Sequence, residues 1–171
     1  MIELIKQDYE KNRKLYYNLL AQLHKVLPTT TPIDHVGSTA IPNICGKNII
    51  DILVGAKDEV EFDNFKEKII SLGYYASKNS KSEIYQFFAS REGETGDGDS
   101  HIHLVIIGTE RYREFLVLRD YLLACPNEAV DYSNHKKELV ERGITDRKLY
   151  RNTKSEYVSK LIERAKNYYN K

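Results

Sequence analysis

The sequence has no tryptophan, one methionine, two cysteines and four prolines in 171 residues. With only Cys45 and Cys125, it lacks the disulfide framework of a small secreted domain, so we expect both thiols to be reduced. No apolar stretch is long enough to span a membrane. The first ten residues carry four charged side chains, whereas a signal peptide would contain an apolar run there. These absences predict a cytoplasmic protein with no membrane partner.

The sequence also lacks an excess of charge of either sign, because 26 Lys and Arg nearly balance 25 Asp and Glu. Such a balance gives no strong signal for nucleic-acid binding, and any anionic ligand must be recognised locally. The length fits one domain of ordinary size, so residues 1–171 are predicted to form a single domain. The oligomeric state is not predicted by any of these features.

Hydrophobic periodicity predicts an α/β (α+β) fold with a mixed sheet of four or five strands. Apolar residues recur at helical steps in five segments, which are 9–26, 59–72, 112–123, 128–141 and 155–168. Strand patterns occur in four segments, which are 33–36, 48–54, 84–89 and 101–107. An acidic loop at 92–99 has turn composition throughout and is expected to be mobile. The prediction is therefore an N-terminal helix, a sheet, and a C-terminal group of helices beside the site.

The strongest motif is a strand that ends in a small-residue turn made of Gly37, Ser38 and Thr39. Asp51 follows twelve residues after Thr39, inside the next predicted strand. A turn of small residues lets backbone N–H groups approach a phosphate, and the two hydroxyls add further donors. A carboxylate on the adjacent strand can hold a metal ion that neutralises the phosphate. The alternative is a purely structural turn in which Ser38 caps a helix.

This arrangement resembles the nucleotidyltransferase superfamily of the DNA polymerase β type, in which a Gly-Ser turn precedes a strand carrying acid-x-acid. Asp51 matches the first acid. Because side chains alternate along a strand, the second acid would stand at position 53 on the same face, and that residue is Leu53. The departure removes a ligand that two-metal transfer would use.

A longer resemblance, to the GrpB family, rests on residues 35–42 and 47–52. The family pattern reads His-x-Gly-Ser-Thr-Ala-Val-Pro-Gly-Leu-Ala-Ala-Lys-Pro-Ile-Ile-Asp-Ile. This sequence departs from the pattern at Asn43, Cys45, Gly46 and Asn48. Residues 101–104 and 118–122 are also similar to the family, as are Tyr150 and Lys154. The resemblance implies a nucleotidyltransferase-like fold and an incompletely understood activity. Some relatives are fused to a dephospho-coenzyme A kinase domain, which associates the family with nucleotide or coenzyme A-related molecules.

His101 and His103 are two residues apart on a predicted strand, so both imidazoles are expected on one face, towards Asp51. Two histidines and one carboxylate can form a metal site. Mg²⁺ or Mn²⁺ is the expected ion, with Zn²⁺ as an alternative. The competing interpretation is that one imidazole is hydrogen-bonded in the core and the other lines a pocket. Asp51, amid apolar strand neighbours, needs a compensating partner, which could be a metal, a cation or Lys47.

Other polar residues have a ligand-binding and a structural interpretation. Lys47 either contacts phosphate or pairs with Asp51. The pairs Arg119 with Asp120, and Tyr132 with Lys136, are typical of solvated or interhelical contacts, and ligand contact is the alternative. Cys45 lies near the candidate site but has no triad partners, so it is interpreted as a small buried hydrophobic residue.

The sequence thus predicts a candidate site with two groups of residues. The catalytic and metal-binding candidates are Asp51, His101 and His103. The candidates for binding a phosphate-bearing ligand are His35, Gly37, Ser38, Thr39, Lys47 and Arg119. Three functions remain open: nucleotidyl or phosphoryl transfer, nucleotide binding without catalysis, and metal-dependent hydrolysis by His101 and His103.

Overall fold

A computed structural model describes residues 3–91, 98–144 and 146–170, apart from the side chains of residues 79–81 and 147. Most of the predicted acidic loop at 92–99 lies outside these residues. Within the described chain, no helix combines the length and the apolarity that crossing a membrane requires.

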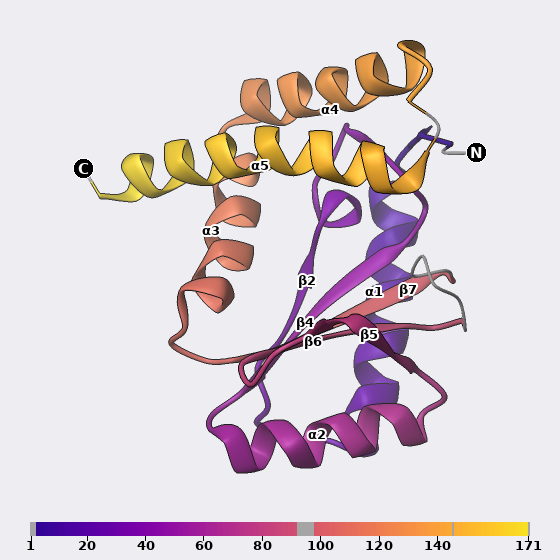
Figure 1. Ribbon diagram of the computed structural model, residues 1–171, viewed down its shortest axis with the longest axis vertical. Coiled ribbons are helices and arrows are strands. Elements are labelled where there is room, and N and C mark those ends of the chain that lie inside the picture. The colour runs from indigo at the N-terminus through magenta and orange to yellow at the C-terminus, as the bar shows by residue number, and fades with distance from the viewer. Residues whose placement is uncertain (1–2, 92–97, 145, 171) are drawn as a thin grey trace.

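The central sheet has five strands, in the order β2-β4-β7-β6-β5 (Figure 1). Their bounds are Ile33–Val36 for β2, Ile50–Ala56 for β4, Tyr75–Lys81 for β5, Tyr85–Ala89 for β6 and Ser100–Ile106 for β7. β4 and β7 are parallel, and the other neighbouring pairs are antiparallel. A small second sheet pairs β1 (Ile5–Lys6) with β3 (Cys45–Gly46). The mixed sheet predicted from the sequence is confirmed.

Two groups of helices lie around this sheet, the first two helices of the chain and the last three. Their bounds are Tyr9–Leu23 for α1, Glu59–Ser71 for α2, Glu110–Ala124 for α3, Pro126–Glu141 for α4 and Arg147–Tyr169 for α5, and a short 3-10 turn, η1, spans Ser38–Ala40. Four of the five helices begin after a side chain that accepts a hydrogen bond from a backbone N–H of the first turn. These caps are Asp8, Asp58, Thr109 and Asp146. The fourth helix instead begins with Pro126, whose missing N–H costs nothing at that position.

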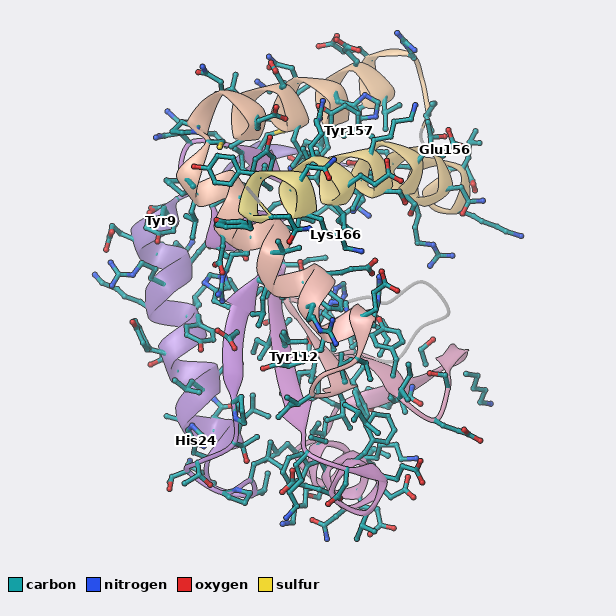
Figure 2. All side chains as sticks on the ribbon, turned by 90° about the vertical axis from the view of Figure 1, so that its left-hand side faces the viewer. Tyr9, His24, Tyr112, Glu156, Tyr157 and Lys166 are labelled. Carbon is teal, nitrogen blue, oxygen red and sulfur yellow. The ribbon has the colours of Figure 1, made fainter. Side chains whose placement is uncertain are left out.

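The two faces of the sheet carry different residues because side chains alternate along each strand. On one face, Ile52, Ile102 and Leu104 pack with residues of α1 and α2 to form the largest core cluster. On the other face, Leu53 and Val105 pack against Tyr112 of α3, which lies beside the strands in Figure 2. This second face also carries Asp51, His101 and His103, so the candidate site shares it with α3.

The C-terminal helices α3, α4 and α5 form a separate cluster with the segment that follows η1. Ile41 and Ile44 pack among residues of all three helices, including Tyr132 of α4 and Leu161 of α5. Figure 1 shows α4 and α5 lying across the end of the sheet from which β4 begins. The predicted C-terminal helical group is confirmed, and it is anchored to the chain directly after the Gly37–Ser38 turn.

Three strands and part of one helix were not predicted. β1 and β3 have two residues each, too few for a periodic pattern. β5 is an edge strand whose sequence, Tyr-Ala-Ser-Lys-Asn-Ser-Lys, has no apolar alternation. α5 begins eight residues before the predicted start at residue 155, because its first turns are rich in cationic and polar residues.

Candidate functional site

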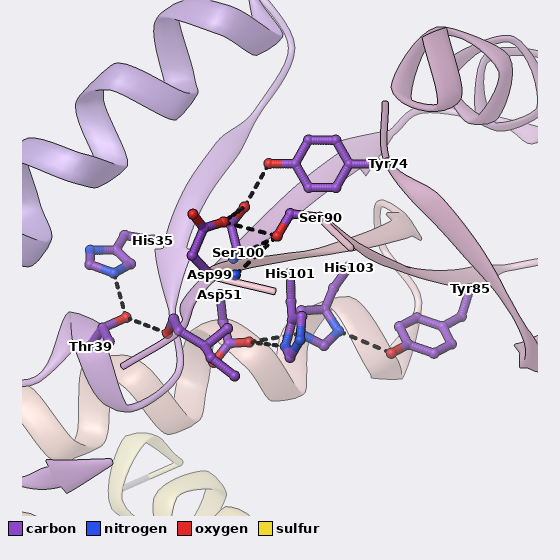
Figure 3. A network of polar contacts seen from close by, with 11 residues as sticks. His35, Thr39, Asp51, Tyr74, Tyr85, Ser90, Asp99, Ser100, His101 and His103 are labelled. Atoms are coloured by element: carbon purple, nitrogen blue, oxygen red, sulfur yellow. Dashed lines mark hydrogen bonds and ion pairs between the residues drawn. The ribbon is translucent and has the colours of Figure 1, made fainter. Parts of the chain in front are cut away.

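Asp51 lies on β4, next to the end of β2 and directly beside His101 of β7 (Figure 3). Its cross-strand neighbour on β2 is Val36, so Gly37 begins the turn at the level of the carboxylate. Gly37 has a φ of 72°, and a Cβ there would collide with the carboxylate of Asp51. Glycine is therefore required both for the backbone conformation and for the space that Asp51 occupies.

The two histidines predicted from their spacing contact the same carboxylate oxygen. Asp51 Oδ1 lies 3.2 Å from Nδ1 of His101 and 3.7 Å from Nε2 of His103. The side chains are partly exposed, at 27% for Asp51, 15% for His101 and 14% for His103. The structure thus brings together the three residues that the sequence proposed as catalytic or metal-binding candidates.

Burial and contact act in opposite directions on these groups. Burial by itself raises the pKa of Asp51, but the hydrogen bonds and charge interactions with His101 and His103 outweigh it and hold that pKa below the usual range. Burial lowers the pKa of His103, although its contact with Asp51 acts in the opposite direction. The site therefore favours a carboxylate facing imidazole N–H groups.

Leu53 occupies the place where the nucleotidyltransferase pattern has its second acid. It is fully buried and packs with Val36, Val105 and Tyr112. An ionised carboxylate at this position would lose its hydration without a compensating partner. The packing between the sheet and α3 therefore requires an apolar residue at the position where the pattern has its second acid.

The structure places His35 and Thr39 behind the turn and not beside the Asp51 carboxylate. His35 points to the opposite face of the sheet, where it stacks on Tyr16 with ring centres 4.9 Å apart, and burial lowers the pKa of His35 to about 4. Thr39 is fully buried, and its hydroxyl contacts Nε2 of His35 and the carbonyl of Ile49. Both residues support the turn from behind, because their polar atoms face the protein interior and not the side of Asp51.

Arg119 was also predicted to bind ligand, and the structure gives it two carboxylate partners instead. Its guanidinium lies 2.8 Å from both Asp34 on β2 and Asp120 on α3. It also donates a hydrogen bond to the carbonyl of His35. This is the structural alternative considered above: an ion pair that joins α3 to β2 and leaves the positive charge of Arg119 neutralised.

Lys47 lies close to the helical group. Its ammonium nitrogen is 5.2 Å from the centre of the Tyr150 ring, at a distance typical of a cation–π interaction. Cys45 is buried and is not in a disulfide, and it donates two hydrogen bonds to Ser133 of α4, from its N–H to the hydroxyl and from its thiol to the carbonyl. These contacts tie the segment after η1 to α4 and α5.

The residue that sequence reasoning undervalued is Lys136 of α4. It is 2% exposed, and its Nζ lies 2.9 Å from Oγ of Ser38 while also donating to the carbonyl of Cys45. Burial lowers the pKa of Lys136 to about 8. The usable signal was its position on the buried stripe of α4, with Ala129, Tyr132, Ser133 and Leu139. A charged residue on such a stripe requires a specific partner.

The described residues do not include a preformed metal cluster. No group of three or more His, Cys, Asp or Glu side chains among them is arranged to hold a metal ion. Asp51, His101 and His103 instead contact one another directly. Their donor types, one carboxylate and two imidazoles, are nevertheless those of many transition-metal sites.

A sequence model of the family described as GrpB protein matches residues 2–164. The chain belongs to the GrpB family. The glutamate-rich protein GrpB of Alkalihalophilus pseudofirmus is 32% identical over 164 residues, covering 92% of this chain and 88% of that protein. Other relatives are longer: the chain spans 54% of a UPF0157 protein of Pseudomonas aeruginosa and 38% of a dephospho-CoA kinase of Mycolicibacterium paratuberculosis.

Solved structures show the same fold. The crystal structure of GrpB from Enterococcus faecalis superposes with a TM-score of 0.83 and 22% identity, covering 99% of this chain and all of that one. A cytoplasmic RNA terminal U-transferase superposes with a TM-score of 0.55 and 14% identity, covering 83% of this chain and 44% of that one. This GrpB chain therefore has a nucleotidyltransferase-like fold.

Proposed function

We propose that this chain binds a nucleotide, or a coenzyme A-related molecule, through its phosphate groups at the Gly37–Ser38 turn and transfers a nucleotidyl or phosphoryl group. The observation that carries the proposal is the position of Lys136. A buried ammonium group is costly unless an anion or several acceptors compensate it. Within the described residues, its hydrogen-bond partners are neutral: the hydroxyl of Ser38 and the carbonyl of Cys45.

Two further features support an anionic ligand at the same place. Lys154 of α5 is close enough to lower the pKa of Lys136 through charge repulsion, so a second positive charge lies near the ammonium that contacts Ser38. Ser38 begins η1, and the first N–H groups of a helix have no partner within it. A phosphate placed here would meet ammonium, hydroxyl and amide donors together.

Asp51 is the acid of this proposed site, and a divalent metal is its proposed companion. Of the groups present, Asp51 with His101 and His103 is the set that would hold the ion. The metal would supply positive charge to the phosphate oxygens. Imidazole ligands suit Zn²⁺, whereas Mg²⁺ and Mn²⁺ prefer carboxylate and water oxygens. If water took the place of the acceptor as the nucleophile, the same three residues would serve a metal-dependent hydrolase.

A nucleotide-binding module without catalysis is the second candidate function, and the burial of Leu53 favours it. Transfer by two metal ions needs carboxylates that bridge them, and Asp51 is left without its usual neighbour. The two candidates share the ligand and differ in turnover. Both are therefore tested first by binding and then by product formation.

The binding test is a thermal-shift panel of nucleoside mono-, di- and triphosphates and coenzyme A, each with Mg²⁺, Mn²⁺, Zn²⁺ or no metal. A ligand that binds only the native state raises the melting temperature. We expect a shift with phosphate-bearing ligands and none with the matching nucleosides. Equal shifts with nucleosides and nucleotides would contradict phosphate recognition at the turn.

The matched variants are Lys136→Met and Lys137→Met, which remove neighbouring charges from α4. Lys136 is buried beside Ser38, whereas Lys137 is exposed. We expect at least a tenfold loss of phosphate-ligand affinity in the first variant and no change in the second, because a charge-assisted hydrogen bond contributes roughly 1.5–3 kcal/mol. Equal affinities in both variants would remove the main support for the proposal.

A further inference from the structure

Tyr85 contacts the side of His103 that faces away from Asp51. The Tyr85 hydroxyl lies 2.9 Å from Nδ1 of His103, while Nε2 of the same ring faces Asp51 (Figure 3). Tyr85 comes from β6 and His103 from β7, and the two rings are nearly parallel, with an interplanar angle of 21°. Both nitrogens of this imidazole therefore face a polar partner, one on each side.

The surroundings of His103 otherwise consist of aromatic rings. Phe87 of β6 and Phe115 of α3 lie with ring centres 5.4 and 4.6 Å from the imidazole. The guanidinium of Arg111 lies over the rings of Tyr85 and Phe115, at 5.2 and 4.8 Å from their centres. An apolar enclosure with a nearby cation disfavours a positive charge on the imidazole, and a neutral imidazole has one N–H and one bare nitrogen.

The hydrogen-bond partners decide which nitrogen carries the proton. An ionised carboxylate can only accept, so the nitrogen turned towards Asp51, 3.7 Å from its Oδ1, is the one placed to carry the N–H. Nδ1 is then bare and can only accept, which makes the Tyr85 hydroxyl the donor. We propose that Tyr85 is a positioning residue that fixes the proton of His103 on Nε2, where it points to Asp51.

A hydroxyl group is suited to this place because it can donate or accept. If a metal ion took Nε2, the proton of a neutral His103 would have to move to Nδ1, and the Tyr85 hydroxyl could rotate to accept it. Phenylalanine could do neither. The inference concerns the protein alone, so it does not depend on the proposed function or on whether a metal binds.

The test is a long-range ¹H–¹⁵N correlation spectrum of histidine-labelled protein without ligand, which distinguishes protonated from bare ring nitrogens. The chain has five histidines, and a His103→Gln variant identifies the resonances of His103 by their loss. We expect a protonated Nε2 and a bare, hydrogen-bonded Nδ1. In Tyr85→Phe, the Nδ1 resonance should move downfield to the position of a bare nitrogen without a donor.

The matched control is Tyr74→Phe, because Tyr74 is buried where Tyr85 is partly buried, and its hydroxyl lies 2.9 Å from Oγ of Ser100, on β7. This variant removes a similar hydrogen bond beside the same strand and should leave the His103 resonances in place. A proton on Nδ1 of His103 in the unsubstituted protein would overturn the proposal, and so would an Nδ1 resonance that Tyr85→Phe does not move. The first of these outcomes is observed in the unsubstituted protein and does not require Tyr85→Phe, so the proposal stays testable if that variant does not fold.

Discussion

The carboxylate of Asp51 fills the space that a Cβ atom at Gly37 would need. Asp51 is on β4 and Gly37 directly follows the last residue of β2, so the antiparallel pairing of β2 with β4 brings them together. Gly37 also has a positive φ of 72°, a conformation that glycine adopts at little cost. The glycine of the turn and the acid of the following strand are thus a single packing unit.

Gly37→Ala is therefore expected to displace Asp51 and to destabilise the protein. The backbone conformation alone costs about 1–3 kcal/mol for a residue with a Cβ, and the steric overlap adds to it. The free energy of unfolding, measured with urea, should fall by more than in Gly73→Ala. Gly73 also has a positive φ, 90°, but a Cβ there would meet nothing within 4 Å. Equal losses of unfolding free energy in the two variants would show that Asp51 moves away from the added Cβ at no cost in stability.

Asp51→Asn tests whether Asp51 serves the ligand more than the fold. Removing the carboxylate relieves its desolvation but also removes its contacts with His101 and His103, which outweigh burial, so we expect a modest loss of stability. The variant should remain folded by circular dichroism and lose metal-dependent ligand binding. Asp34→Asn is the control, because it breaks the ion pair with Arg119 on the neighbouring strand. Unchanged ligand affinity in Asp51→Asn would remove this acid from the site.

Leu53→Asp introduces the acid-x-acid pattern into this chain. We expect the variant to lose stability and not to gain a metal ligand. Replacing a fully buried leucine by alanine costs about 2–5 kcal/mol, and an unpaired buried carboxylate costs several more. Urea unfolding should therefore show that Leu53→Asp is less stable than Leu53→Ala. A Leu53→Asp protein that is as stable as Leu53→Ala and binds a second Mn²⁺ ion would show that the apolar cluster under Asp51 tolerates a metal ligand.

Local pattern was enough to predict how Asp51, His101 and His103 come together. Two-residue alternation places His101 and His103 on one face of a strand, and a strand next to a small-residue turn places Asp51 near that turn. The same rule predicted that position 53 shares the face of Asp51. These relations depend on strand geometry, which short sequence segments determine.

Contacts between distant segments could not be predicted in this way. Lys136 and Ser38 are 98 residues apart, and their contact depends on how α4 packs against the segment after η1. Arg119 was paired with Asp120 from the sequence, but nothing indicated its second partner, Asp34, because an arginine that binds phosphate and one that binds Asp34 look alike in sequence. His35 followed the strand alternation onto the other face, although its place in the motif suggested a ligand contact.

The buried ammonium of Lys136 should make stability depend on pH above neutrality. Burial lowers its pKa from the ordinary 10.5 to about 8 in the folded protein. Between these values the unfolded chain binds a proton that the folded chain has released, so the contribution of Lys136 to the free energy of unfolding rises with pH. Lys136→Met lacks this contribution. The unfolding free energy of the unsubstituted protein minus that of the variant should grow by up to roughly 3 kcal/mol from pH 7 to pH 10.

Urea unfolding at pH 7, 8, 9 and 10 measures this difference, and taking it between two proteins cancels the titration of other groups that they share. Lys137→Met provides the baseline, because that side chain is exposed and its removal should give a difference that does not vary with pH. Phosphate-ligand affinity should follow the opposite course, since an anion favours charged Lys136 and binding should weaken as the ammonium loses its proton. A stability difference for Lys136→Met that stays constant across this range would mean that the ammonium group titrates as an exposed lysine does, and that its burial beside Ser38 carries no electrostatic cost for a ligand to offset.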